Sequence, residues 1–394
     1  MTTRPARAVS APPIPFSRPD ITEEEIDAVT RTLRGGWVTT GPAAAGFEVE
    51  LAALVGGGVE AVAVSSATAG LHLALEACGI GPGDEVIVPT WTFTATAEVV
   101  RYLGADPVVV DVDPVTLNLE PAAVEAAIGP RTRAVLVVHF GGLAADTAGI
   151  AAVAQAHGVR VVEDAAHALP ASRDGAAVGS APHSDAVVFS FYATKPVTTG
   201  EGGMLTTRDP AIADRARVMR LHGIDRDAFD RYRTASAGWA YDVVAPGFKN
   251  NLPDPAAAMG RVQLRRAHAM RTRRAAIAAT YAAEWAHLPL DLPASGRPDD
   301  LHAWHLFTVR LGDDAPVRRD VFVEALARRG IATSVHFIPL HRLTYWRDSL
   351  GLQPDAFPVA EDAYGRVVSV PLFSAMTDDE VTRVVSAVRE VLEA

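Results

Sequence analysis

The sequence predicts an α/β fold in which helices cover both faces of a mainly parallel sheet, followed by a smaller α+β domain. Two observations support this prediction. From about residue 60, short β-branched runs alternate with alanine-rich segments whose apolar residues recur at helical spacing. Such alternation is typical of parallel sheets with crossover helices. From about residue 270 it gives way to a mixed order of helices and strands.

The strands expected in the sheet are short β-branched runs, and helical segments separate the first five of them. The expected strands cover residues 60–64, 85–89, 106–112, 133–140, 159–165 and 186–192. The expected helices cover residues 67–79, 94–104, 120–129 and 146–158. Several of them end at glycine, a common residue at helix C-termini. In such sheets ligands bind beyond the carboxyl ends of the strands, so functional residues are expected there.

The C-terminal part is expected to form a separate domain. Its expected elements are a helix at about 262–286, a strand at 302–311, a helix at 317–330, a strand at 332–337 and a helix at 378–394. The first forty residues are proline-rich and then helical, which suggests an arm associated with this smaller domain. We therefore expect three parts: an N-terminal arm at 1–40, a large ligand-binding domain at 41–270 and a small C-terminal domain at 271–394.

Composition argues against several classes of function. The formal net charge of -11 at pH 7 opposes broad attraction to nucleic acid or an anionic membrane. Cys78 is the only cysteine, so neither an intramolecular disulfide nor a cysteine-rich metal site is expected. No stretch approaches the roughly twenty apolar residues of a membrane helix, and the opening segment lacks the apolar run of a signal peptide. We therefore expect a cytoplasmic protein without a metal, membrane or nucleic-acid partner.

The first polar junction lies at residues 65–70, where an expected strand is followed by a helix. Ser65, Ser66 and Thr68 supply hydroxyls there, and Gly70 lets the backbone approach closely. A helix N-terminus offers free N–H groups and a positive dipole, so the junction is a candidate phosphate-binding site. The alternative is that these hydroxyls only cap the helix.

The second junction is the run VVEDAAHAL, in which a pair of acids closes a buried strand. A carboxylate at a strand end, such as that of Asp164, can keep a ring nitrogen protonated through a charge-assisted hydrogen bond. His167 is placed to support that carboxylate or to stack on the same ring. The alternative is a helix cap followed by a structural histidine.

The third junction is the run VVFSFYATKPVTTGEGG, which contains Lys195. The chain has only two lysines, Lys195 and Lys249, and every other basic side chain apart from histidine is arginine. A neutral amine attacks a carbonyl to form a Schiff base, which a guanidinium does not do at ordinary pH. A lysine retained here favours chemistry over simple solvation, although Lys249 is retained as well.

A single cofactor accounts for the three junctions. A phosphate-binding turn, an acid for a ring nitrogen and an amine for an aldehyde match the three functional groups of pyridoxal 5'-phosphate. In this interpretation Asp164 keeps the pyridine nitrogen protonated and Lys195 holds the aldehyde. Once displaced by a substrate, Lys195 becomes a base that moves a proton between the substrate carbon and the cofactor. The alternative is that the junctions are structural and the chain binds another phosphate ligand.

Eight sequence runs recur in a fixed order over almost the whole chain. They are WVTTGP (37–42), SSATAGLHLAL (65–75), GPGDEVIVPTWTFTATA (81–97), VVEDAAHALPA (161–171), FSFYATKPVTTGEGGML (189–205), LHGI (221–224), PGFKNNLPDPAAAMGRVQL (246–264) and VHFIPLH (335–341). In these runs the chain resembles the DegT-type sugar aminotransferases, a family of fold-type I pyridoxal phosphate enzymes. The resemblance implies a large domain with a seven-stranded, mainly parallel sheet and a smaller α+β C-terminal domain.

The resemblance also implies roles for individual residues. Lys195 is the Schiff-base lysine, and Asp164 pairs with the pyridine nitrogen. Phe93 stacks on the cofactor and His167 lies beside its ring, whereas Trp91 is left as a core residue.

The phosphate is expected to bind Thr68, Ala69 and Ser190. In the family the block at 246–254 reaches into the site of a partner subunit, which implies a homodimer with shared sites. Asn251 is the expected cross-subunit phosphate contact, with two alternates, Asn250 and Lys249. The aromatic and arginine-rich stretch at 225–246 is either a cover for a nucleotide or a solvated loop.

Members of the family act on nucleotide-linked keto-hexoses and usually take nitrogen from L-glutamate, with the cofactor passing through its pyridoxamine phosphate form. Members acting at sugar C3 tend to carry a Tyr-Pro pair and a Gln after the His of the small-domain strand, whereas SVHFIPLH resembles the C4-acting members. His336 and Phe337 are therefore expected to line the sugar site, with Thr39 and Thr40 opposite. We expect a 4-aminotransferase that uses dTDP-4-keto-6-deoxy-D-glucose.

Three alternatives stay open at this point. One is a C3-aminotransferase acting on a dTDP-3-keto-6-deoxyhexose. Another is a sugar dehydratase of the same fold, although those enzymes replace the Schiff-base lysine with histidine and Lys195 argues against this branch. The third is a non-catalytic regulator that binds pyridoxal phosphate or a sugar, for which neither Lys195 nor Asp164 is needed.

Overall fold

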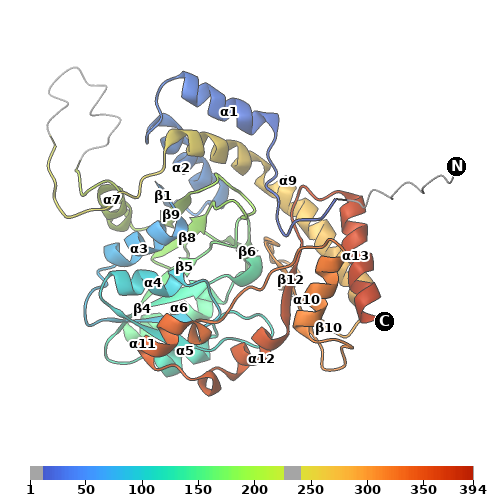
Figure 1. Ribbon diagram of the computed structural model, residues 1–394. Helices are drawn as coiled ribbons and strands as arrows, with labels where there is room; N and C mark the ends of the chain where they lie inside the picture. Colours follow the sequence, from blue (N-terminus) through green and yellow to red (C-terminus); the bar gives the residue numbers. More distant parts are fainter. Residues whose placement is uncertain (1–11, 226–240, 394) are drawn as a thin grey trace.

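A seven-stranded sheet forms the centre of the large domain in the computed structural model, which describes residues 12–225 and 241–393 (Figure 1). Its strands, in spatial order, are β1 (Glu60–Val64), β9 (Gly203–Thr207), β8 (Ala186–Ser190), β5 (Arg160–Asp164), β4 (Thr132–Val138), β2 (Glu85–Pro89) and β3 (Asp106–Val110). β9 runs antiparallel to both of its neighbours, and the other strand pairs are parallel. The predicted mainly parallel α/β fold is therefore confirmed.

Helices cover both faces of the sheet, as the alternating sequence pattern predicts. They are α2 (Pro42–Val55), α3 (Ala67–Ala77), α4 (Ala95–Tyr102), α5 (Pro121–Ala127), α6 (Thr147–His157) and α7 (Pro210–Met219). Along β8, Val188 packs in the core beneath α3 and α4, whereas Val187 and Phe189 pack in the core beneath α2. Because side chains alternate along a strand, Asp164 at the end of β5 faces the same side as Val162, toward α3 and α4.

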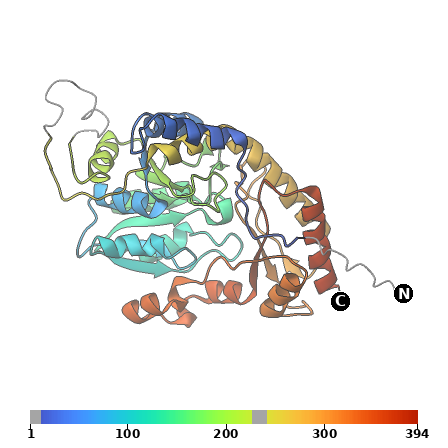
Figure 2. The same ribbon diagram turned by 45° about the horizontal axis from the view of Figure 1, so that its top comes forward.

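The small domain is built on an antiparallel sheet of β10 (Leu290–Asp291), β11 (Phe307–Leu311) and β12 (Val367–Val370). The helices α10 (Arg319–Arg328) and α13 (Asp378–Leu392) belong to this domain. Their apolar residues share one core with the C-terminal half of α9 (Asp254–Trp285), in which Trp285 is fully buried. α9 thus crosses from the large domain to the small one (Figure 2). We propose that the boundary between the large and the small domain lies within this helix, between residues 270 and 271.

The N-terminal segment contacts both parts of the molecule. The backbone of Ile14 pairs with that of Ile331, and Arg383 of α13 donates to the carbonyl of Pro12 at 2.9 Å. After this segment, α1 (Glu23–Arg34) lies along α9, where Gln263 donates to Glu25 at 2.8 Å. The remaining short elements are β6 (Ser172–Arg173), β7 (Ala176–Ala177), α11 (Thr344–Leu350), α12 (Pro358–Arg366) and the 3-10 turns η1 (Phe140–Gly142), η2 (Leu340–Arg342) and η3 (Pro354–Ala356).

Two expectations about the C-terminal part were wrong. The segment 332–337 is not a strand: it makes one isolated bridge, from Ser334 to Ser369, and the sheet partner of β11 is β12 instead. The long helix begins at Asp254 rather than near 262, because Pro253 and Pro255 occupy its start, where no backbone N–H is needed. The stretch 225–246 lies mostly outside the described residues. Within residues 12–225 and 241–393, no helix is long and apolar enough to cross a membrane.

Candidate active site

A cavity of about 500 Å³ opens beyond the carboxyl ends of β5 and β8, between the large domain and the small one. The sheet end supplies one wall, and residues 305 and 336–337 supply the opposite wall. The predicted site residues that line it are Thr68, Phe93, Asp164, His167, Ser190, Lys195, His336 and Phe337. The three polar junctions identified in the sequence therefore meet in one space.

Asp164 is a buried carboxylate held by two donors. Thr96 Oγ1 donates to its Oδ2 at 2.8 Å, and the backbone N–H of Ala166 donates to its Oδ1 at 3.1 Å. The hydroxyls of Thr92 and Thr96 lie 2.7 Å apart, so a short chain of hydroxyls ends on the carboxylate. Asp164 is 7% exposed, and the surface it keeps lies in the cavity. This arrangement fixes the direction from which a hydrogen-bond donor in the cavity can reach Asp164.

The turn between β1 and α3 forms the second wall of the cavity. Ser66 caps α3, because its Oγ accepts from the N–H of Ala69 at 3.1 Å. Thr68 and Ser190 present their side chains to the cavity, whereas Ala69 does not line it. A Cβ on Gly203 would lie 2.6 Å from the carbonyl of Ser66, so β9 can press against this turn only with glycine at that position. Because Ser66 serves as the cap, the hydroxyl of Thr68 is available to an anion in the cavity.

Lys195 lies in the turn that follows β8, with its backbone N–H donating to Tyr192 at 2.9 Å. Burial lowers the pKa of its amine to about 8, and the negative charge of Asp164 opposes part of that shift. A depressed pKa increases the fraction of neutral amine near pH 7, which is the form that attacks carbonyl carbons.

Three histidines surround the Lys195 amine, and none of them adds a positive charge near neutral pH. Burial lowers the pKa values of His167 and His305 well below the usual range, and the charge of Lys195 lowers them further. The same causes lower the pKa of His336 to about 4. His167 Nδ1 accepts from the N–H of Gly141 at 3.2 Å, so its proton is on Nε2. His167 makes no hydrogen bond to Asp164.

Aromatic rings close the mouth of the cavity. Phe93 is 60% exposed and its ring centre lies 6.2 Å from that of Phe337. Phe337 in turn stacks on His167, with centres 5.7 Å apart and planes 25° from parallel. Trp91, two residues before Phe93, is fully buried in the core, as expected. The exposed ring of Phe93 is thus available to a flat ligand.

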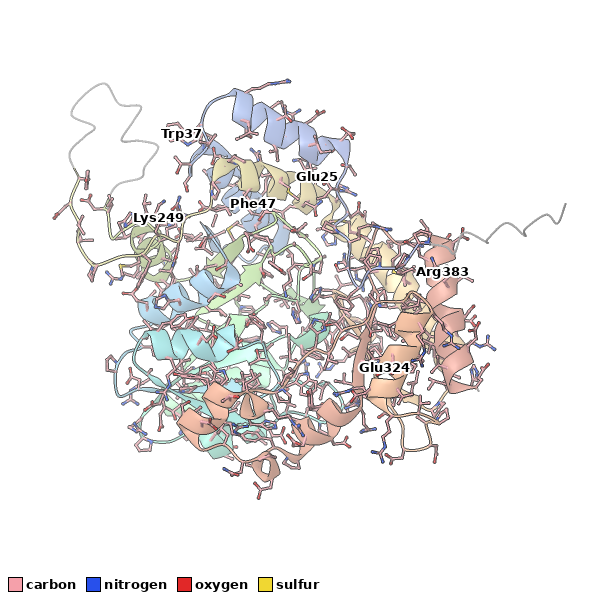
Figure 3. All side chains as sticks on the ribbon, viewed as in Figure 1. Glu25, Trp37, Phe47, Lys249, Glu324 and Arg383 are labelled. Carbon is pink, nitrogen blue, oxygen red and sulfur yellow. The ribbon has the colours of Figure 1, made fainter. Side chains whose placement is uncertain are left out.

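The remaining predicted residues do not line this cavity. Asn251 donates to Thr40 Oγ1 at 2.7 Å, and Thr40 donates to the carbonyl of Leu252 at 2.7 Å. Lys249 is hydrogen-bonded to Asn251. Figure 3 places Lys249 on the side of the molecule that also carries Trp37, away from α10 and α13. Thr39, Thr40 and Asn251 thus do not line the cavity, although the backbone of Asn251 pairs with that of Val64, close to the β1–α3 turn.

The sequence reasoning missed three side chains of the site. Thr92 and Thr96 belong to the run TWTFTAT, in which every second residue is a threonine. This regularity is a signal, but no role was predicted for either residue. His305 lines the cavity from the small domain. It lies within the strand expected at 302–311, which begins only at Phe307, and nothing local distinguishes it from His302, which does not line the cavity.

The donor set has a definite chemistry. A helix N-terminus with free hydroxyls suits a phosphate, a buried carboxylate suits a protonated ring nitrogen, and a neutral amine suits an aldehyde. In the described part of the chain, no group of three or more His, Cys, Asp or Glu side chains is arranged to hold a metal ion. The cavity fits an aromatic aldehyde with a phosphate at one end.

Comparison with protein families identifies the chain. The model of the DegT/DnrJ/EryC1/StrS aminotransferase family matches residues 19–389. The chain belongs to this family. Over 382 residues it is 46% identical to the spore coat polysaccharide biosynthesis protein SpsC of Bacillus subtilis, and the match covers 96% of the chain and 97% of SpsC.

Solved structures of the family superpose over nearly the whole chain. The putative sugar aminotransferase Spr1654 of Streptococcus pneumoniae in its PMP form is 33% identical with a TM-score of 0.89, covering 96% of this chain and 99% of that one. The same protein is known in its PLP form, with a TM-score of 0.88. DesV of S. venezuelae, in complex with a ketimine intermediate, is 35% identical with a TM-score of 0.86, covering 98% of this chain and 100% of that one.

The chain is therefore a pyridoxal phosphate-dependent sugar aminotransferase. The donor set of the cavity suits this cofactor: the Thr68 turn suits its phosphate, Asp164 its ring nitrogen and Lys195 its aldehyde. The non-catalytic regulator is excluded by this membership.

The depressed pKa of Lys195 predicts how cofactor attachment depends on pH. With a pKa of about 8, roughly a tenth of the amine is neutral at pH 7 and nearly all of it above pH 9. The rate at which cofactor-free protein gains covalently linked pyridoxal phosphate should therefore rise with pH and level off, with a midpoint near 8. Stopped-flow absorbance across a pH series measures this rate. A rate that still climbs about tenfold per pH unit beyond pH 9 would indicate an ordinary lysine near 10.4.

Proposed function

We propose that the protein transfers the amino group of L-glutamate to the C4 ketone of a nucleotide-linked 4-keto-6-deoxyhexose, with dTDP-4-keto-6-deoxy-D-glucose as the substrate. The proposal rests on the run SVHFIPLH, which resembles the C4-acting members of the family. It is supported by the position of His336 and Phe337, which line the same cavity as Asp164 and Ser190.

The residues of the cavity divide the work of this reaction. When bound, pyridoxal phosphate supplies a ring that accepts electrons from the bond broken at the substrate carbon. Asp164 keeps the ring nitrogen protonated, and Thr96 holds the carboxylate in place. Lys195 carries the proton to and from the substrate carbon. His167 and His336 border the sugar. Because both are neutral, they do not repel the Lys195 cation.

The position of the new amine tests the proposal directly. Purified protein with pyridoxal phosphate, L-glutamate and dTDP-4-keto-6-deoxy-D-glucose should form a 4-amino-4,6-dideoxy sugar, identified by NMR from the shift of H4. The matched reaction with dTDP-3-keto-6-deoxy-D-glucose should proceed more slowly by about tenfold or more, since a ketone one carbon away is misplaced relative to Lys195. Nitrogen at C3, or faster turnover of the 3-keto substrate, would contradict the C4 assignment and favour the C3 alternative.

We also propose that two chains form a homodimer in which each supplies Asn251 to the site of the other, and that Thr39 and Thr40 line the partner's sugar site. Two features support this. Asn251 donates to Thr40, and neither these two residues nor Thr39 lines the cavity of their own chain. Exposed apolar residues also lie nearby on α1, α2 and the segment between them: Ile26, Leu33, Val38 and Val49. An apolar surface of this kind is typical of subunit interfaces.

Mixed dimers test the shared site. Asn251→Asp sets a negative charge against a bound phosphate, while Lys249 can still donate to the new carboxylate. Lys195→Ala and Asn251→Asp chains should each have little activity alone. Co-expressed, they should recover about a quarter of wild-type activity, because in half of the dimers one site receives both intact residues. Activity of the mixture no higher than that of the better parent would contradict the shared site.

A further inference from the structure

Arg274 of α9 is a buried cation without an acidic partner. Its side chain is 2% exposed, and its Nε donates to the carbonyl of Ala303 at 3.1 Å. Its Nη2 is buried without a hydrogen-bond partner, and it forms no ion pair with any residue in 12–225 or 241–393. A buried charge left without a counter-charge is strongly destabilising. Its presence therefore calls for an anion that the chain itself does not supply.

Arg274 borders a small cavity that is also lined by Lys195. The space measures about 20 Å³, and its wall includes Lys195 and His305, which line the 500 Å³ cavity as well. The small cavity therefore adjoins the larger one at Lys195 and His305, on the side toward α9. About 10–15 Å³ holds one water molecule, so one oxygen atom of a ligand can enter.

Of the two arginines around this small cavity, Arg274 is the one without an ion pair among the described residues, and burial lowers its pKa more than the charge of Asp20 raises it. Arg18 is paired with Glu380, at 2.9 Å. Asp20, the acid in this wall, is paired with Arg266 at 2.6 Å. The remaining lining side chains are neutral apart from Lys195, so the free guanidinium nitrogen selects a negatively charged oxygen.

The two substrates of an aminotransferase differ in the anion they carry near the reacting atoms. An amino donor has a carboxylate on the very carbon that bears its amine, so the anchor for that carboxylate must border the place where the amine reacts. The sugar acceptor has no carboxylate, and its diphosphate is far too large for a space of about 20 Å³. The position beside Lys195 therefore matches the α-carboxylate of the donor.

We propose that Arg274 binds the α-carboxylate of the amino donor, with His305 as the neighbouring hydrogen-bonding group. This inference rests on the proposed function in one respect, the choice of L-glutamate as donor. In the second half of the reaction the keto-sugar occupies the space beside Lys195. The guanidinium of Arg274 does not disturb it, because the recess admits only one oxygen atom.

A purely structural role is the competing explanation. Arg271, one turn earlier on α9, donates through Nε to the carbonyl of His302 at 3.0 Å, so both arginines hold the segment that leads to His305. The hydrogen bond from Nε is sufficient for a structural role. Such a role does not explain why Nη2 is buried without a partner. The two explanations differ in which half of the reaction they affect.

The half-reactions separate them. Arg274→Met keeps the length of the side chain and removes the charge. Arg273→Met is the matched control, since Arg273 donates to the carbonyl of Met376 and to Asp378 of α13 and does not line either cavity. In single-turnover absorbance measurements, Arg274→Met should raise the apparent Kd of the holoenzyme for L-glutamate by about tenfold to a hundredfold. The half-reaction of the pyridoxamine form with the keto-sugar should change less than about threefold. Arg273→Met should alter neither.

Binding of a non-reacting probe gives a readout that does not depend on turnover. Glutarate carries two carboxylates and no amine, and calorimetric titration of the holoenzyme should show binding that weakens by about tenfold in Arg274→Met. If Arg274→Met does not fold, Arg274→Lys takes its place, because it keeps the charge but lacks the planar fork; glutamate affinity should then fall by less than about tenfold.

Three results would overturn the proposal: unchanged glutamate affinity in a folded Arg274 variant, equal losses in both half-reactions, or unchanged binding of glutarate. If the wild-type protein does not react with L-glutamate at all, the donor assignment fails instead. The glutarate titration then still decides the carboxylate site. Neither measurement involves the position of amination on the sugar, so failure at C4 leaves this inference untouched.

Discussion

Replacing Lys195 with alanine is expected to abolish amino transfer, with a loss of about a thousandfold or more. The amine is the one group in the cavity that both holds the aldehyde of the cofactor and moves the proton at the substrate carbon. The variant should bind pyridoxal phosphate through the Thr68 turn and Asp164 but lack the visible absorbance of a lysine-linked cofactor. Borohydride reduction followed by mass analysis of the peptide containing residue 195 checks the linkage.

Lys195→Arg and Lys249→Ala are the matched controls. Lys195→Arg keeps a positive charge in the cavity but supplies no nucleophile, so its activity should also be lost. Lys249→Ala should keep the absorbance band, because Lys249 does not line this cavity. A Lys195→Ala protein that retains the band, or transfers amino groups at more than about a hundredth of the normal rate, would refute the assignment.

The fold and the firmest site residues could be predicted because they depend on local rules. Strand-end residues of a parallel sheet converge in space, so Asp164 and Lys195 were expected to meet once β5 and β8 were recognised. The same rule selected Thr68, whereas Ser190 was predicted only through the resemblance to the family. The motif VHFIPLH then brought the small-domain wall into the prediction, through a resemblance rather than through periodicity.

The missed residues depend on packing that no local pattern reports. Thr96 becomes part of the site only because α4 packs over the end of β5, where its hydroxyl reaches Asp164. Arg274 lies in an arginine-rich run of α9, and only the tertiary fold separates it from its exposed neighbours. The strand expected at 332–337 has a β-branched pattern, but after Ser334 its backbone leaves the sheet and carries His336 and Phe337 to the cavity. At this segment the positions of His336 and Phe337 at the cavity outweigh the local preference for a strand.

Asp164→Asn is expected to lower the rate of the glutamate half-reaction by about a hundredfold or more, because it removes the negative charge that keeps the ring nitrogen of the cofactor protonated. An asparagine has the same shape; its amide oxygen can accept from the N–H of Ala166 while its NH2 donates to Thr96 Oγ1, so the loss should come from charge rather than from packing. Single-turnover absorbance gives the rate, and equilibrium titration gives the affinity for pyridoxal phosphate, which should fall by about tenfold.

Thr96→Val separates the charge of Asp164 from its orientation. Valine keeps the volume of threonine but removes the hydroxyl that donates to Asp164 Oδ2 at 2.8 Å. The carboxylate then keeps its charge and its bond from Ala166, so the rate should fall by only about threefold to tenfold. Thr94→Val is the matched control on the same segment, since its hydroxyl bonds Glu98 and Trp346 and does not reach Asp164. If Asp164→Asn costs no more than Thr96→Val, the carboxylate acts by position alone, and its charge is not what drives the reaction.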